Sequence, residues 1–121
     1  MSYESVVELA SQARPGVSIV VAKLSFGRRL ELLRRIREIA QKVEFLAAGS
    51  DPKEQMEAAV LAAEIDRTYV VWGLKEVKGL EVDGATATPE SLVSAGPLDL
   101  FAEALAAVKA ECGLTEPERK N

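Results

Sequence analysis

Two long stretches of the chain carry apolar residues at every third or fourth position, a spacing that predicts amphipathic helices. The first stretch follows Ser25-Phe26-Gly27 and ends before Gly49, a residue type that commonly terminates a helix. Its apolar stripe is predicted to comprise Leu33, Ile36, Ile39, Ala40, Val43, Leu46 and Ala47. Opposite charges four residues apart support the same helix on its polar side; the pairs are Glu31–Arg35, Arg34–Glu38 and Glu38–Lys42.

The second helix is predicted to begin after Asp51, because Asp suits an N-cap and Pro52 suits the first helical position. It should run to about Leu74 or beyond. Its apolar residues form two stripes, one of Met56, Ala59, Val60, Ala63, Val70 and Leu74 and one of Leu61, Ile65, Thr68 and Trp72. A helix that is apolar on two sides packs against two neighbours, or against one neighbour and a partner chain.

Two segments are rich in β-forming signals. Residues 17–24 contain several β-branched side chains and indicate a possible strand. Near residues 77–87, Asp83-Gly84 lies between short β-prone runs and predicts a small β-hairpin, because a type I′ turn needs positive φ at both central residues. Upstream, residues 6–9 are compatible with either a short strand or a frayed turn.

Two shorter helices complete the predicted fold. One starts at Thr88-Pro89 and ends at Gly96-Pro97, and the next runs from there to Gly113 with an amphipathic pattern. The fold class is therefore mainly α (α+β), a helical domain with a small β element. We expect one domain over residues 1–121, with weakly ordered ends at about 1–5 and 115–121.

Composition narrows the chemistry that is available to this chain of 121 residues. It has no His and a single Cys, Cys112, which excludes a disulfide within the chain and every His-dependent triad. A Cys/His zinc site is nearly excluded as well. The glycines do not have phosphate-loop spacing, and the acidic residues do not match a calcium-binding loop. We therefore expect no enzyme activity, no cofactor and no metal.

No segment is apolar for long enough to span a bilayer, and the first apolar run, 17–24, is interrupted by Ser18 and Lys23. The N-terminus lacks the basic region of a signal peptide. We expect a cytoplasmic protein with no membrane partner.

Charge is distributed unevenly between the two long helices, although the chain as a whole carries a net charge of −4. Residues 23–42 contain seven basic and two acidic side chains, whereas residues 51–66 contain five acidic and one basic. Complementarity between two antiparallel helices is the first interpretation, and a protein-binding face is the second. Nucleic-acid binding is the least favoured, because the chain is acidic overall and contains no groove-reading motif.

Candidate partner-binding residues are exposed arginines and aromatics, the residue types that concentrate in interfaces. Tyr69 and Trp72 lie three residues apart and form either a core pair or a surface anchor. The full set is Phe26, Arg28, Arg29, Arg34, Arg35, Arg37, Tyr69 and Trp72.

Several short segments of the sequence follow one another in a characteristic order. They are SFGRR at 25–29, VEFL at 43–46, WGLKEVKGL at 72–80, VDG at 82–84, TPESL at 88–92, GP at 96–97 and ECGLTEPERKN at 111–121. Over about residues 17–121 this order resembles small proteins of the tail assembly chaperone type, which are encoded in the tail-gene clusters of phages and prophages. These segments are structural motifs rather than a catalytic signature.

The resemblance implies a non-enzymatic role in the bacterial cytoplasm. Such chaperones coat the long apolar tape-measure protein, keep it soluble and help to recruit tail-tube subunits; many are made in two forms by frameshifting. A homo-oligomer is possible. Three rival functions stay open: a structural tail or head–tail component, a small enzyme subunit or regulator, and an adaptor that binds protein or nucleic acid through the Arg-rich helix.

Overall fold

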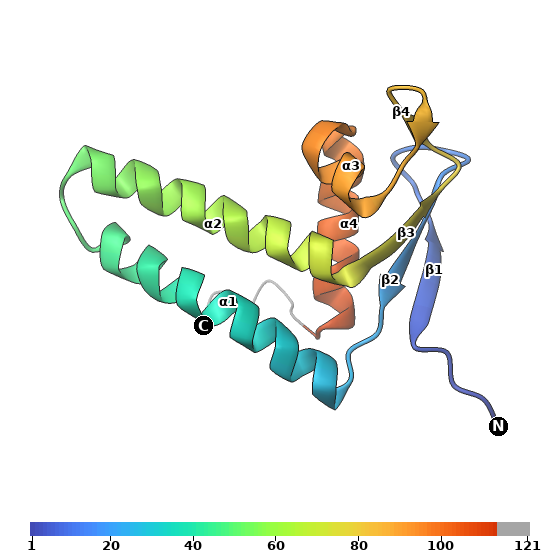
Figure 1. The fold of residues 1–121 in the computed structure, drawn as a ribbon, viewed down its shortest axis with the longest axis horizontal. Coiled ribbons are helices and arrows are strands. Elements are labelled where there is room, and N and C mark those ends of the chain that lie inside the picture. Colours follow the sequence, from blue (N-terminus) through green and yellow to red (C-terminus); the bar gives the residue numbers. More distant parts are fainter. Residues whose placement is uncertain (114–121) are drawn as a thin grey trace.

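The computed structural model describes residues 1–113 as a small antiparallel sheet packed against helices (Figure 1). Strands β1 (Val6–Ala10), β2 (Ser18–Ala22) and β3 (Leu74–Lys78) pair in the order β1-β2-β3, and both pairings are antiparallel. Helices α1 (Phe26–Ala47) and α2 (Pro52–Gly73) lie between β2 and β3 in the chain. The predicted mainly helical α+β fold is confirmed.

The second half of the described chain closes the fold. A two-stranded ladder of β4 (Glu81–Val82) and β5 (Ala85–Thr86) follows β3, and helices α3 (Pro89–Ala95) and α4 (Leu98–Glu111) come after it. The predicted weakly ordered tail at about 115–121 lies outside the described residues. Weak order at about 1–5 stays a prediction, although the Ser5 carbonyl accepts a hydrogen bond from the Lys23 amide at 2.9 Å.

Local sequence signals set most element boundaries. The Ser25 side chain accepts a hydrogen bond from the Arg28 amide and begins α1, and the Asp51 carboxylate accepts one from the Lys53 amide and begins α2. Asp83 and Gly84 have φ angles of 53° and 83°, as the predicted tight hairpin requires. The predicted strand at 17–24 is confirmed by β2, and the uncertain segment at 6–9 is strand β1.

The core lies between one face of the sheet and the inner sides of α2, α3 and α4. Its fully buried side chains include Ile19 and Val21 from β2, Leu74 from β3, and Leu100 and Val108 from α4. Helix α2 ends at Gly73. Leu74, which was predicted to belong to that helix, is instead the first residue of β3 and pairs with Val21. Gly73 has no side chain to separate α2 from α4: a Cβ there would lie 2.5 Å from Val108 Cγ1.

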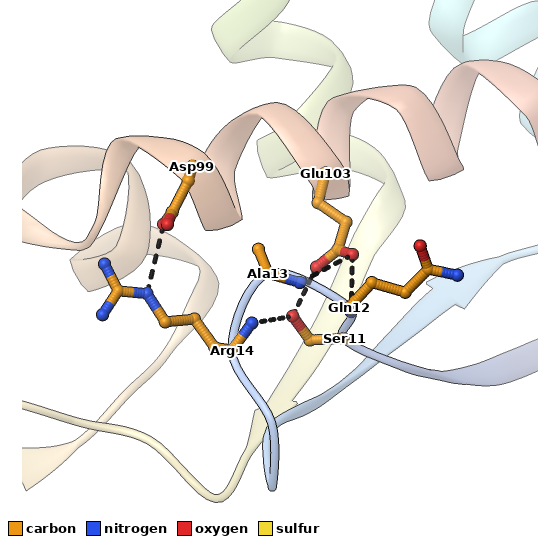
Figure 2. Close-up of polar contacts among 6 residues, drawn as sticks. All are labelled: Ser11, Gln12, Ala13, Arg14, Asp99 and Glu103. Atoms are coloured by element: carbon orange, nitrogen blue, oxygen red, sulfur yellow. Dashed lines mark hydrogen bonds and ion pairs between the residues drawn. The ribbon is translucent and has the colours of Figure 1, made fainter.

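A polar cluster fastens the β1–β2 loop to α4 (Figure 2). The Glu103 carboxylate accepts hydrogen bonds from Ser11 Oγ and from the Gln12 and Ala13 amides, the last two at 2.8 and 3.4 Å. Arg14 Nε lies 3.2 Å from Asp99 Oδ1, one turn earlier on α4. These hydrogen bonds hold the pKa of Glu103 below its usual value, so the carboxylate is ionised and serves as an anchor for the loop.

Helices α1 and α2 form an antiparallel hairpin that reaches away from the sheet (Figure 1). Leu32 is the only buried residue of α1, which shows how little of this helix is covered. The predicted apolar stripe is therefore partly wrong: Leu33 is 59% exposed and Ala47 is also exposed. The stripe is centred instead on Leu32 and on half-buried residues from Ile36 to Leu46, because α2 covers only one side of α1.

Candidate functional site

One stripe of α2 is covered for only half of its length. Its members are spaced alternately three and four residues apart, and they are Met56, Ala59, Ala63, Asp66, Val70 and Gly73. This spacing keeps them on one side of a helix and is the spacing of helix–helix seams.

Helix α4 packs on the end of the stripe nearest the sheet. Lys109 Nζ lies 3.3 Å from Asp66 Oδ1, and Val108 fills the space over Gly73. Val70, between them, is fully buried. Beyond Asp66 the stripe continues towards the α1–α2 loop with its side chains exposed, and Met56 is 72% exposed.

The flanking side of α1 forms a groove of about 670 Å³ with α2 and the end of α4. Its apolar lining includes Leu33, Ile36 and Ala40 from α1, together with Tyr69 from α2 and Cys112 after α4. Because α4 borders both the groove and the α2 stripe, the two lie on the same side of the hairpin. We call this combined surface the open face; it consists of Leu33, Ile36 and Ala40 with Met56, Ala59 and Ala63.

The only charged side chains that line the groove, within the described part of the chain, are Arg29 and Arg37. Burial raises the pKa of the Cys112 thiol, so this cysteine stays protonated and contributes a small, largely apolar surface. Lys109 Nζ lies 5.3 Å from the centre of the Tyr69 ring, a cation–π contact between α4 and α2.

The arginines singled out from the sequence do not form a single face. Arg28 is committed to the fold, because its guanidinium donates to the carbonyls of Ser5 at 2.6 Å and Lys23 at 2.9 Å. Arg35 pairs with Glu31 at 2.8 Å, as the sequence predicts. Arg34 does not line the groove, and at about 3.6 residues per turn it lies nearly opposite the buried Leu32. Of these arginines, only Arg29 and Arg37 line the groove.

The other predicted ion pairs of α1 are absent among residues 1–113: neither Arg34–Glu38 nor Glu38–Lys42 is within 4.0 Å. Within the same range no ion pair joins α1 to α2 directly. Arg35 and Glu64 nevertheless border one shallow hollow, so the opposite charges of the two helices act over longer distances.

The aromatic candidates fall into three different environments. Trp72 is 4% exposed and belongs to the core, so its interpretation as a surface anchor is wrong; its stripe faces the interior where α2 joins the sheet. Tyr69 is half-buried at the groove. Phe26 is exposed at the first turn of α1.

Sequence reasoning missed the open face itself, although it identified both of its stripes. Spacing places Met56, Ala59 and Ala63 on one side of α2, but it does not show that α4 stops short of them. Leu33 was assigned to the apolar stripe of the first long helix, and the structure places it at the groove, where it is exposed.

Two other features of residues 1–113 bear on function: the arrangement of potential metal ligands and the length and hydropathy of the helices. No group of three or more His, Cys, Asp or Glu side chains is arranged to hold a metal ion there. None of the helices in that range has the length and hydropathy needed to cross a membrane.

Comparisons of the chain with protein-family models, curated proteins and solved structures found no significant match.

Proposed function

We propose that this protein is a non-enzymatic chaperone that binds an apolar helical client, in the manner of the phage tail assembly chaperones that its sequence resembles. The observation that carries the proposal is the α2 stripe, which already serves as a helix-packing seam under α4 and continues uncovered through Ala63, Ala59 and Met56. An apolar stripe at this spacing binds a partner helix through anchors at i, i+3, i+4 and i+7.

Binding would be non-covalent and reversible. Full burial of a Leu, Met or Val side chain contributes about 1.5–3 kcal/mol. Leu33 and Met56 are the large exposed side chains of the open face, so covering them contributes a few kcal/mol, against an association cost of about 4–15 kcal/mol. A single copy therefore binds weakly, and several copies along one long client would hold it soluble while allowing tail-tube subunits to displace them.

The proposal is tested by co-expression in bacterial cytoplasm with a long helical protein of the tape-measure type, followed by pull-down and a solubility assay. The client should be soluble only when this chain co-purifies with it. Leu33→Asp, which charges the open face, should abolish that effect.

Phe45→Asp is the matched control, because Phe45 is 77% exposed on the same helix but lines a different, shallow hollow with Glu38 and Lys42. It should leave client solubility unchanged. A client that is equally insoluble with and without this chain contradicts the proposal. If the pure chain instead assembles into stable rings, a structural tail component becomes the better interpretation.

A further inference from the structure

The charges around the open face point to the chemistry of the helix that it binds. We propose that the open face takes an amphipathic helix whose apolar seam is flanked by carboxylates at the end that lies next to α4. This inference rests on the proposed function and narrows the client from any apolar helix to one of defined charge and placement.

A helix is the expected occupant because of the existing packing on the same stripe. Val108 of α4 lies close enough to α2 that only glycine fits at position 73. The uncovered half of the stripe repeats the same three–four spacing with small side chains, Ala59 and Ala63, which also allow a partner backbone to approach closely. An extended peptide has no corresponding match, because its side chains alternate with a period of two.

The carboxylates are inferred from Arg29 and Arg37. Both line the groove, Arg29 in the first turn of α1 and Arg37 about two turns further along, and neither has an ion-pair partner within 4.0 Å among residues 1–113. Both residues are exposed in the free chain. A helix that covers the groove removes part of each guanidinium from water, and a carboxylate on that helix compensates by matching the forked geometry with two parallel hydrogen bonds. Towards the α1–α2 loop the corresponding side of α1 carries Glu44, so the cationic character is confined to one end of the open face.

Two fluorescein-labelled synthetic peptides test this directly against the full chain. Both are amphipathic helices of about 21 residues with the same Leu/Ala seam. In one, the positions flanking the seam in its first and last turns are Glu, and in the other they are Lys. Fluorescence anisotropy should show tighter binding of the Glu peptide, and raising the salt concentration should reduce the difference because exposed charges are screened.

Arg37→Glu is the diagnostic variant and Arg34→Glu is its control. The two substitutions make the same charge change on the same helix, but only Arg37 lines the groove. Arg37→Glu should lower the affinity for the Glu peptide roughly fivefold to tenfold, because an attractive charge pair becomes a repulsive one. It should raise the affinity for the Lys peptide. Arg34→Glu should change either affinity by less than about twofold. Both positions are on the surface of α1, so both variants should fold.

Equal affinity for the two peptides, or equal losses in the two variants, overturns the inference. So does a concentration-dependent dimer that excludes both peptides, since a second copy would then be the occupant. The proposed function is judged separately. If the chain solubilises the client but binds both peptides equally, only the charge assignment is refuted. Discrimination between the peptides without solubilisation refutes only the chaperone role.

Discussion

The packing of α2 on α4 makes a quantitative prediction about Gly73. A Cβ at this position would lie 2.5 and 2.9 Å from the two Cγ atoms of Val108, which is fully buried. Overpacking of this kind costs about 1–3 kcal/mol. The φ angle of Gly73 lies outside the positive region, so Ala gains up to about 1 kcal/mol from its higher helix propensity. Steric overlap is the larger effect, and Gly73→Ala should lower the free energy of unfolding by about 1–2 kcal/mol.

The measurement is urea denaturation followed by the fluorescence of Trp72, the only tryptophan, which is buried next to the substituted residue. Gly27→Ala is the matched control, because nothing lies within 4 Å of a Cβ at that position in the first turn of α1. It should be neutral or stabilising by a few tenths of a kcal/mol.

A double-mutant cycle separates overlap from other causes. Val108→Ala removes both atoms that overlap with the new Cβ, so Gly73→Ala should be nearly neutral in that background. The coupling free energy should be at least about 1 kcal/mol, as expected for residues in direct contact. Two results would refute the close packing of α2 on α4. One is an equal loss of unfolding free energy from Gly73→Ala in the wild-type and Val108→Ala backgrounds, and the other is no loss in the wild-type background.

Two further predictions concern polar contacts at the ends of β1. Glu103→Gln should lower the free energy of unfolding by about 1 kcal/mol, because the charged acceptor of the β1–β2 loop is lost. Since the pKa of Glu103 is lowered by folding, its contribution is fully present above the unfolded-state value of about 4.3 and disappears as the pH falls through the folded-state value. Denaturation curves of wild type and variant should therefore converge in acid, and a constant difference at all pH values would contradict this account. Arg28→Met removes two hydrogen bonds to backbone carbonyls and should accelerate hydrogen exchange at the Lys23 amide without lowering global stability by more than about 1 kcal/mol; unchanged exchange there would show that the guanidinium does not hold the N-terminal segment.

The sequence by itself determined the features that depend on neighbours within a few residues. The starts of the long helices follow from caps such as Asp51, whose carboxylate reaches an amide only two positions away. The β-hairpin follows from Asp83 and Gly84, which tolerate positive φ in any context. Apolar spacing likewise determined that α2 has two apolar sides.

Tertiary structure decided what covers each stripe, because spacing defines a side of a helix but does not specify its neighbour. Leu32 rather than Leu33 is buried, since α2 lies on only one side of α1. Leu74 leaves the predicted helix because it pairs with Val21, more than fifty residues away, and that long-range contact outweighs local propensity.

Tertiary structure also decided which residues form the candidate site. Seven basic residues between 23 and 42 are visible in the sequence, but the fold commits Arg28 to backbone carbonyls and brings only Arg29 and Arg37 to the groove. The open face exists because α4 crosses α2 near the sheet and ends, leaving the apolar stripe exposed beyond Asp66. That outcome depends on where two helices meet, which is fixed by core packing around Gly73 and Val108 and not by any local pattern.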